Sequence, residues 1–167
     1  MGTMEQIVVT PITSAEFILG KTMPSIILGF INMIFVTLIS VFWFDIPVRG
    51  NMVTLLVANG FYLMTTIGTG LYISTISATQ QQAMMSAFFF YLPAVLLSGF
   101  MFPIANMPEA VQVFTYLNPL RYFLIIIRGI FLKGVGVAVL WPQMLALLIL
   151  GSLVLTLAVK RFHKNIA

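Results

Sequence analysis

The sequence has 167 residues, of which 60% are hydrophobic and 7% charged, and its mean hydropathy is +1.09. Soluble domains carry roughly 25% charged residues, so eight Lys or Arg and four Asp or Glu side chains are too few to cover a water-soluble molecule of this size. This composition excludes an ordinary soluble domain, and the absence of cysteine excludes disulfides and Cys-ligated zinc.

Residues 1–20 are predicted to form an elbow segment at the membrane surface. Thr13 and Glu16 have the spacing of a capping box, so a helix is expected to begin there. Residues 15–22 also match the phosphate-loop pattern except at the first position, where Ala15 replaces a glycine. Bulky side chains fill the middle of this stretch, so it is not expected to bind nucleotide.

Four segments are apolar and long enough to cross a bilayer as helices, which requires about 20 residues each. They are residues 22–44, 52–73, 83–102 and 139–162. The third contains Pro93, where a kink is expected. Four crossings place both ends of the chain on the same side. The fold class expected is therefore an all-α, polytopic membrane helix bundle.

Residues 103–136 are apolar but interrupted, and they lie between the third and fourth predicted spans. The residues that break or mark this region are Pro103, Pro108, Asn118, Pro119, Arg121 and Arg128. No uninterrupted apolar run here reaches the length of a span. We predict two short helices, residues 107–117 and 119–132, that dip into the membrane or lie at its edge.

Small residues recur every four positions in and after the second span, at Thr66, Gly70, Ser74 and Ala78. Residues with this spacing share one helix face, and small side chains let membrane helices approach closely. This stripe is predicted to pack against another helix, within the chain or across a dimer.

The ionisable residues indicate what the chain does not do. No Asp, Glu or His lies deep in any predicted span, whereas proton-driven carriers need an intramembrane ionisable relay. No catalytic, cofactor-binding or metal-binding set stands out either. Basic residues gather only near the last span, at Lys160, Arg161 and Lys164, which fits anionic lipid rather than nucleic acid. Four basic residues on each side leave the orientation undecided by charge.

Two stretches resemble a known family. Residues 2–12 are similar to the cytoplasmic G-T-x-E-Q-x-x-x-T-P segment of ABC-2 type permeases, the membrane subunits of ABC exporters. Residues 97–103, 106–108 and 118–129 resemble the signature that precedes the last span of that family. The resemblance covers essentially the whole chain and corresponds to the C-terminal half of the family, so a fragment or a truncated gene is expected.

The resemblance implies a permease that exports a substrate by alternating access, as a homodimer or heterodimer with ATPase subunits. ATP and Mg²⁺ would sit on those subunits, and this chain would bind no cofactor. The residues implied to couple to the ATPase are Thr3, Glu5, Gln6, Thr10 and Pro11. Both termini would be cytoplasmic, in the inner membrane, with residues 103–136 outside.

Two other functions stay open from the sequence. A small channel or an energy-independent carrier would need only this chain and would move its substrate without an ATPase. A membrane assembly or interaction protein, such as a truncated relic, would transport nothing. The transported substrate is not indicated by any residue pattern.

Overall fold

The computed structural model describes residues 14–166, and every regular element in this range is helical. The α-helices are α2 (Ser14–Phe42), α3 (Met52–Ile76), α4 (Gln80–Leu96), α5 (Glu109–Thr115), α6 (Pro119–Arg128) and α7 (Val137–Ile166). A 3₁₀ turn, η1 (Ile104–Asn106), precedes α5, and a π-helical turn, η2 (Gly129–Lys133), continues α6. The all-helical prediction is confirmed for the described part of the chain.

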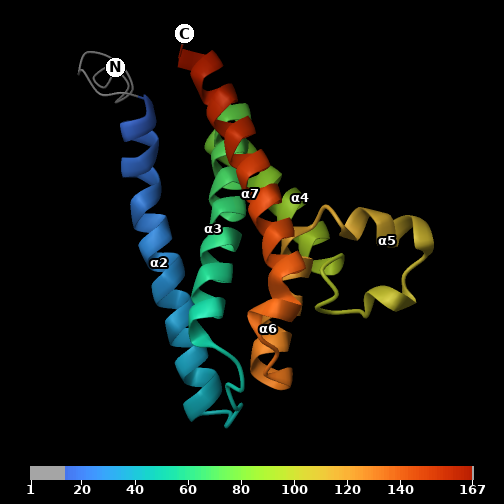
Figure 1. Ribbon diagram of the computed structural model, residues 1–167. Coiled ribbons are helices and arrows are strands. Elements are labelled where there is room, and N and C mark those ends of the chain that lie inside the picture. The colour runs from blue at the N-terminus through green and yellow to red at the C-terminus, as the bar shows by residue number, and fades with distance from the viewer. Residues whose placement is uncertain (1–13, 167) are drawn as a thin grey trace.

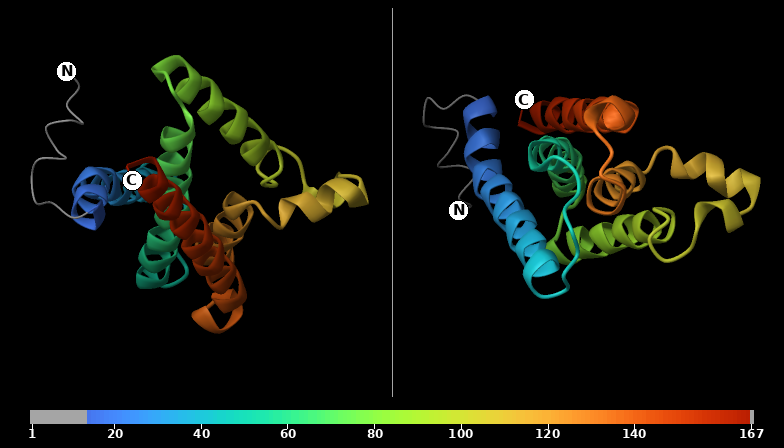
Figure 2. Two further views of the ribbon diagram at one scale, coloured as in Figure 1. Left: turned by 90° about the horizontal axis from the view of Figure 1, so that it is seen from above. Right: turned by 60° about the horizontal axis from the view of Figure 1, so that its bottom comes forward.

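The three long helices α2, α3 and α7 lie side by side, with α3 in the middle (Figure 1). We call the end where α2 begins and α7 finishes the terminal end. The opposite end, formed by residues 43–51 and η2, is the loop end (Figure 1). The α4 helix leans away from this group, and α5 projects to the side (Figure 2).

Three described helices are long and apolar enough to cross a membrane, over residues 19–42, 52–76 and 137–161. The short helices α5 and α6 with η2 form a pair bent by 83°, which would make a fourth, broken span. The chain is therefore a multi-pass membrane protein. The 17-residue helix α4 is not among these candidate spans.

The third apolar segment forms a shorter helix than the sequence led us to expect. Instead of residues 83–102, the helix covers Gln80–Leu96 and contains Pro93 close to its end. The hydroxyl of Ser98 donates to the carbonyl of Val95 (2.6 Å) and accepts from the amide of Phe100 (3.1 Å). Gly99 then adopts a positive φ of 81°. These local bonds replace the next helical turn, so the helix stops here.

The elbow and the first span are not separate elements in the structure. The α2 helix runs without interruption over Ser14–Phe42, so residues 14–20 belong to the same helix as the first predicted span. Pro24 lies inside this helix. Residues 1–13 lie outside the described part of the chain, and so does the Thr13 side of the expected capping box.

The core lies where α3 meets α7 and α6. Its fully buried members include Leu55, Ala58, Ile126, Ile130 and Leu147. The helices α3 and α7 run in the same direction, from the loop end to the terminal end (Figure 1). Their close approach depends on glycine, because a Cβ at Gly68 would lie 3.0 Å from the backbone nitrogen of Leu155.

Two connections are joined at the loop end. The amide of Gly50 donates to the carbonyl of Ile130 in η2 (2.9 Å). Gly134, which ends η2, has a φ of 62° and lies against the backbone of Arg49. The turn between α2 and α3 therefore rests on the turn that leads into α7.

Gly134→Ala is expected to lower the free energy of unfolding by about 1 to 2 kcal/mol, because a Cβ is strained at this positive φ. A Cβ at this position would also lie 3.1 Å from the carbonyl oxygen of Arg49. The measurement is unfolding in mixed micelles, with Gly136→Ala as the control, since nothing lies within 4 Å of a Cβ there. Equal midpoints for the two variants would contradict this account of the turn.

Candidate functional site

The short helices of residues 103–136 are held on α4 by one asparagine. The Asn118 side chain donates to the carbonyl of Ala94 (2.6 Å), 24 residues earlier in the chain. Its other side-chain atom, Oδ1, accepts from the amide of Leu120 (3.1 Å) and so caps the first turn of α6. Asn118 is 7% exposed. A single buried side chain thus starts α6 and joins it to α4.

The three prolines of this region begin helical elements. Pro103 precedes η1, Pro108 precedes α5, and Pro119 is the first residue of α6. Proline suits these positions because its fixed φ fits a first turn, where the amide has no helical partner. The two helices expected over residues 107–117 and 119–132 therefore occur, with α5 and α6 shorter than those ranges.

The two arginines of this region make contacts within the chain. The Nη1 of Arg121 donates to the hydroxyl of Thr115, and its guanidinium lies over the ring of Tyr116 (4.1 Å to the centroid). The Nε of Arg121 is buried without a hydrogen-bond partner among the described residues. Arg128 donates to the carbonyl of Gly99 (3.1 Å). These contacts join residues 97–128 into one connected unit, which we call the short-helix unit.

The small-residue stripe faces away from α7. Thr66, Gly70 and Ser74 are exposed, whereas the side of α3 that packs on α7 contains Gly68 and Thr65. The prediction placed four stripe residues on one helix face. That placement is wrong for Ala78, because α3 ends at Ile76 and the cap residue Ser77 is extended.

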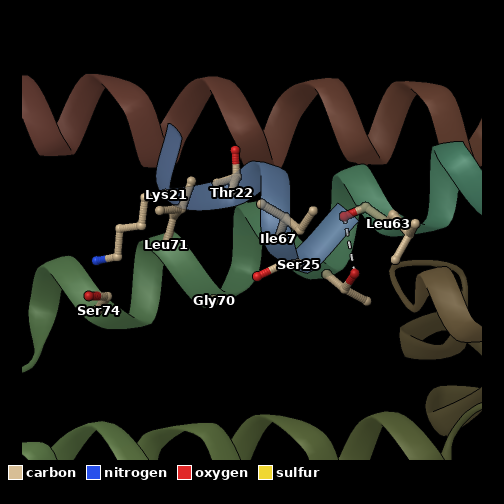
Figure 3. Close-up of a pocket in the computed structure, with 9 residues that line it drawn as sticks. Lys21, Thr22, Ser25, Leu63, Ile67, Gly70, Leu71 and Ser74 are labelled. Atoms are coloured by element: carbon tan, nitrogen blue, oxygen red, sulfur yellow. Dashed lines mark hydrogen bonds between the residues drawn. The ribbon is translucent and has the colours of Figure 1, made fainter. Parts of the chain in front are cut away.

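The exposed stripe lines a groove between α2 and α3, with a volume of about 370 Å³. Lys21 and Ser25 from α2 face Gly70 and Ser74 from α3 across it (Figure 3). We did not predict this groove from the sequence, since it requires two helices to be placed together. The available signal was the four-residue spacing of Lys21 and Ser25, which puts both on one face of α2.

Most apolar side chains of α4 are exposed. No residue of α4 is buried. The exposed aromatic run is Phe88, Phe89, Phe90 and Tyr91, of which Phe89 is 76% exposed. Such a surface requires lipid or another protein chain to cover it.

The residues predicted to couple to an ATPase lie in the part of the chain that the structure does not describe. They are Thr3, Glu5, Gln6, Thr10 and Pro11. Their role stays a prediction. The structure describes what directly follows them, which is the continuous helix α2.

The sequence of this chain matches the family model of the ABC-2 type transporter over residues 1–132. The chain belongs to the ABC-2 type transporter family. The match includes both stretches whose resemblance was noted above, residues 2–12 and the segments between residues 97 and 129. The groove, the short-helix unit and the exposed face of α4 are thus features of an ABC-2 membrane domain.

Two curated relatives of this ABC-2 chain are named as probable permeases. It is 32% identical over 165 residues to the probable multidrug ABC transporter permease YbhR of Escherichia coli K12, covering 99% of this chain and 45% of that protein. It is 40% identical over 137 residues to the probable multidrug ABC transporter permease YbhS of the same organism, covering 80% and 36%. The chain thus spans less than half the length of these relatives. No solved structure matches.

A more distant relative is the ABC transporter G family member 20 of Dictyostelium discoideum. The identity is 23% over 170 residues, which cover 99% of the ABC-2 chain and 23% of that protein. The likeness to YbhR and to this protein includes α7, which follows the part matched by the family model.

Proposed function

We propose that this chain forms part of the membrane-spanning permease of an ATP-driven exporter. The observation that carries the proposal is the family match over residues 1–132, together with relatives that are named as ABC transporter permeases. The ATPase activity, with its ATP and Mg²⁺, is assigned to a separate nucleotide-binding subunit. This division agrees with the rejection of residues 15–22 as a phosphate loop.

The proposed mechanism uses α2 as the moving part. Because α2 is one helix of 29 residues, a displacement of the coupling segment at residues 1–13 shifts it as a rod. Among the side chains described in α2, only Thr22 and Thr37 are buried, whereas α3 and α7 share the core. The helix nearest the coupling segment is therefore held less tightly by its neighbours than α3 and α7 are.

In the proposed orientation both termini are cytoplasmic, so the terminal end faces the ATPase. The support for this orientation is the resemblance of residues 2–12 to a cytoplasmic segment of the family, because four basic residues on each side leave the orientation undecided by charge. The loop end and the short helices then face outward. There they shape the exit for the transported substrate. The tight packing of Gly134 on Arg49 holds the two turns of this end together.

We further assign the exposed apolar surfaces of α4 and α5 to a second permease subunit and to lipid. On α5 and the turn after it, Phe114 is 65% exposed and Leu117 is 70% exposed. The α5 helix projects sideways from the rest of the chain (Figure 2). A projecting apolar helix is stable only when another surface covers it.

Glu5→Gln is expected to reduce stimulation of the ATPase by the permease about tenfold, because it removes a charge from the proposed contact with that subunit. The measurement is the rate of ATP hydrolysis in proteoliposomes that contain both the ATPase and the permease. The permease is used in the longest form that its gene encodes. The matched control is Asp45→Asn, which removes the same charge at the loop end and suits the positive φ of 51° there.

Unchanged stimulation in Glu5→Gln would overturn the coupling role. Substrate flux in liposomes that contain the chain without any ATPase would instead favour the channel or carrier. That second measurement tests the proposed energy source, since a driven exporter moves nothing without nucleotide.

A further inference from the structure

The groove between α2 and α3 spans half of a membrane. Its α3 side runs from Leu63, in the middle of the helix, to Ser74, near its end. At about 1.5 Å per residue this is roughly 16 Å, which is half of a hydrocarbon core about 30 Å thick. The groove therefore extends from the membrane surface at the terminal end to the midplane.

The two ends of the groove differ in chemistry. At the surface end, the ammonium of Lys21 extends toward the hydroxyl of Ser74 (Figure 3). At the midplane end, the lining includes the apolar Leu63 and Ile67, and the hydroxyl of Thr66 between them donates to the carbonyl of Leu63. A molecule that fits both ends carries an anionic head and a hydrocarbon tail.

The polar groups that line the groove differ in their partners, since the hydroxyls of Thr22 and Thr66 donate to carbonyls of their own helices. Elsewhere in the spans, hydroxyls such as those of Ser40 and Thr69 donate to a carbonyl one turn earlier. Neither Ser25 nor Ser74 has a hydrogen bond within the described residues, and no acidic group there pairs with Lys21. Such groups favour a polar ligand where hydrocarbon surrounds them.

We infer that this groove binds an anionic phospholipid, with Lys21, Ser25 and Ser74 at the phosphate and an acyl chain against Leu63 and Ile67. A volume of about 370 Å³ suits a headgroup and the first part of one chain. The remaining hydrocarbon lies in the surrounding bilayer. The inference depends on the membrane setting and not on the proposed coupling to an ATPase.

The test measures lipid binding to the purified chain in detergent by native mass spectrometry. Phosphatidylglycerol is compared with phosphatidylcholine that has the same acyl chains. Both lipids carry a phosphate, but the choline cation cancels its charge in phosphatidylcholine, so the attraction of one Lys to net negative charge predicts that phosphatidylglycerol binds about fivefold more tightly. Lys21→Gln is expected to abolish this preference and Lys21→Arg to keep it. Lys160→Gln is the matched control, since Lys160 is a basic residue of α7 that does not line the groove.

A second variant tests the cavity itself. A Cβ at Gly70 has nothing within 4 Å, so Gly70→Leu fills the groove without disturbing the fold. It is expected to weaken binding of both lipids, whereas Gly20→Leu, which also points into open space but does not line the groove, leaves binding unchanged. Circular dichroism and gel filtration establish that both variants are folded.

Three results would overturn the inference. The first is equal binding of the two lipids to the wild type. The second is the same binding by Gly70→Leu and Gly20→Leu, which would also be seen if protein covered the groove. The third is displacement of phosphatidylglycerol by inorganic phosphate at low concentration, which would indicate a site for a free anion instead of a lipid.

Discussion

Gly68→Leu is expected to lower the free energy of unfolding by about 3 kcal/mol, since it places a large side chain where two helices touch. A Cβ at Gly68 already lies 3.0 Å from the backbone nitrogen of Leu155 and 3.1 Å from Cγ1 of Val154. Backbone atoms do not move aside as a side chain does, so α3 and α7 have to separate. The measurement is the unfolding transition in mixed micelles of increasing denaturing detergent.

The chain offers a matched control for this variant only two residues away. Gly70→Leu makes the same chemical change on the opposite side of α3, where a Cβ meets nothing within 4 Å. It also shares any gain in helix propensity that comes from replacing glycine. A Gly68→Leu transition that coincides with that of Gly70→Leu would show that α3 and α7 do not meet at this point.

Asn118→Ala is expected to destabilise the short-helix unit by about 2 kcal/mol. About half of this comes from the lost cap of α6 and about half from the lost bond to Ala94. Hydrogen exchange measures the effect directly, because the amides of α5 and α6 should exchange faster while those of α3 keep their protection.

Two further variants separate the roles of this side chain. Asn118→Asp keeps an oxygen that accepts from the amide of Leu120 but has no amide to donate to the carbonyl of Ala94. It should therefore destabilise the short-helix unit about half as much as Asn118→Ala does. Asn106→Ala is the control, as an exposed asparagine of the same region with no side-chain cap bond. Protection unchanged in Asn118→Ala would contradict the assigned junction between α4 and α6.

The long helices and the short-helix region were predictable because their signals are local. Hydropathy marks α2, α3 and α7, and the prolines at 103, 108 and 119 mark the starts of the elements between α4 and α7. The early end of α4 also had a local signal in Gly99, which we had placed inside a span. A glycine next to Ser98 favours a turn as readily as a helix.

The pairing of α3 with α7 was not predictable in the same way. Both faces of α3 carry small residues, with Thr65 and Gly68 on one and Thr66 and Gly70 on the other. The sequence shows that close approach is possible but not which face another helix takes. That choice depends on Gly151 and Leu155, far along the chain, so it carries no local pattern.

The parallel contact between α3 and α7 has a consequence for the order of assembly. At about 5 to 20 residues per second, synthesis delivers α7 several seconds after α3 has left the ribosome. Until then Gly68 and Thr65 of α3, which lie against Leu155 and Gly151 in the folded chain, have no α7 to pack on. The helix α7 thus closes the core some time after α3 has been made.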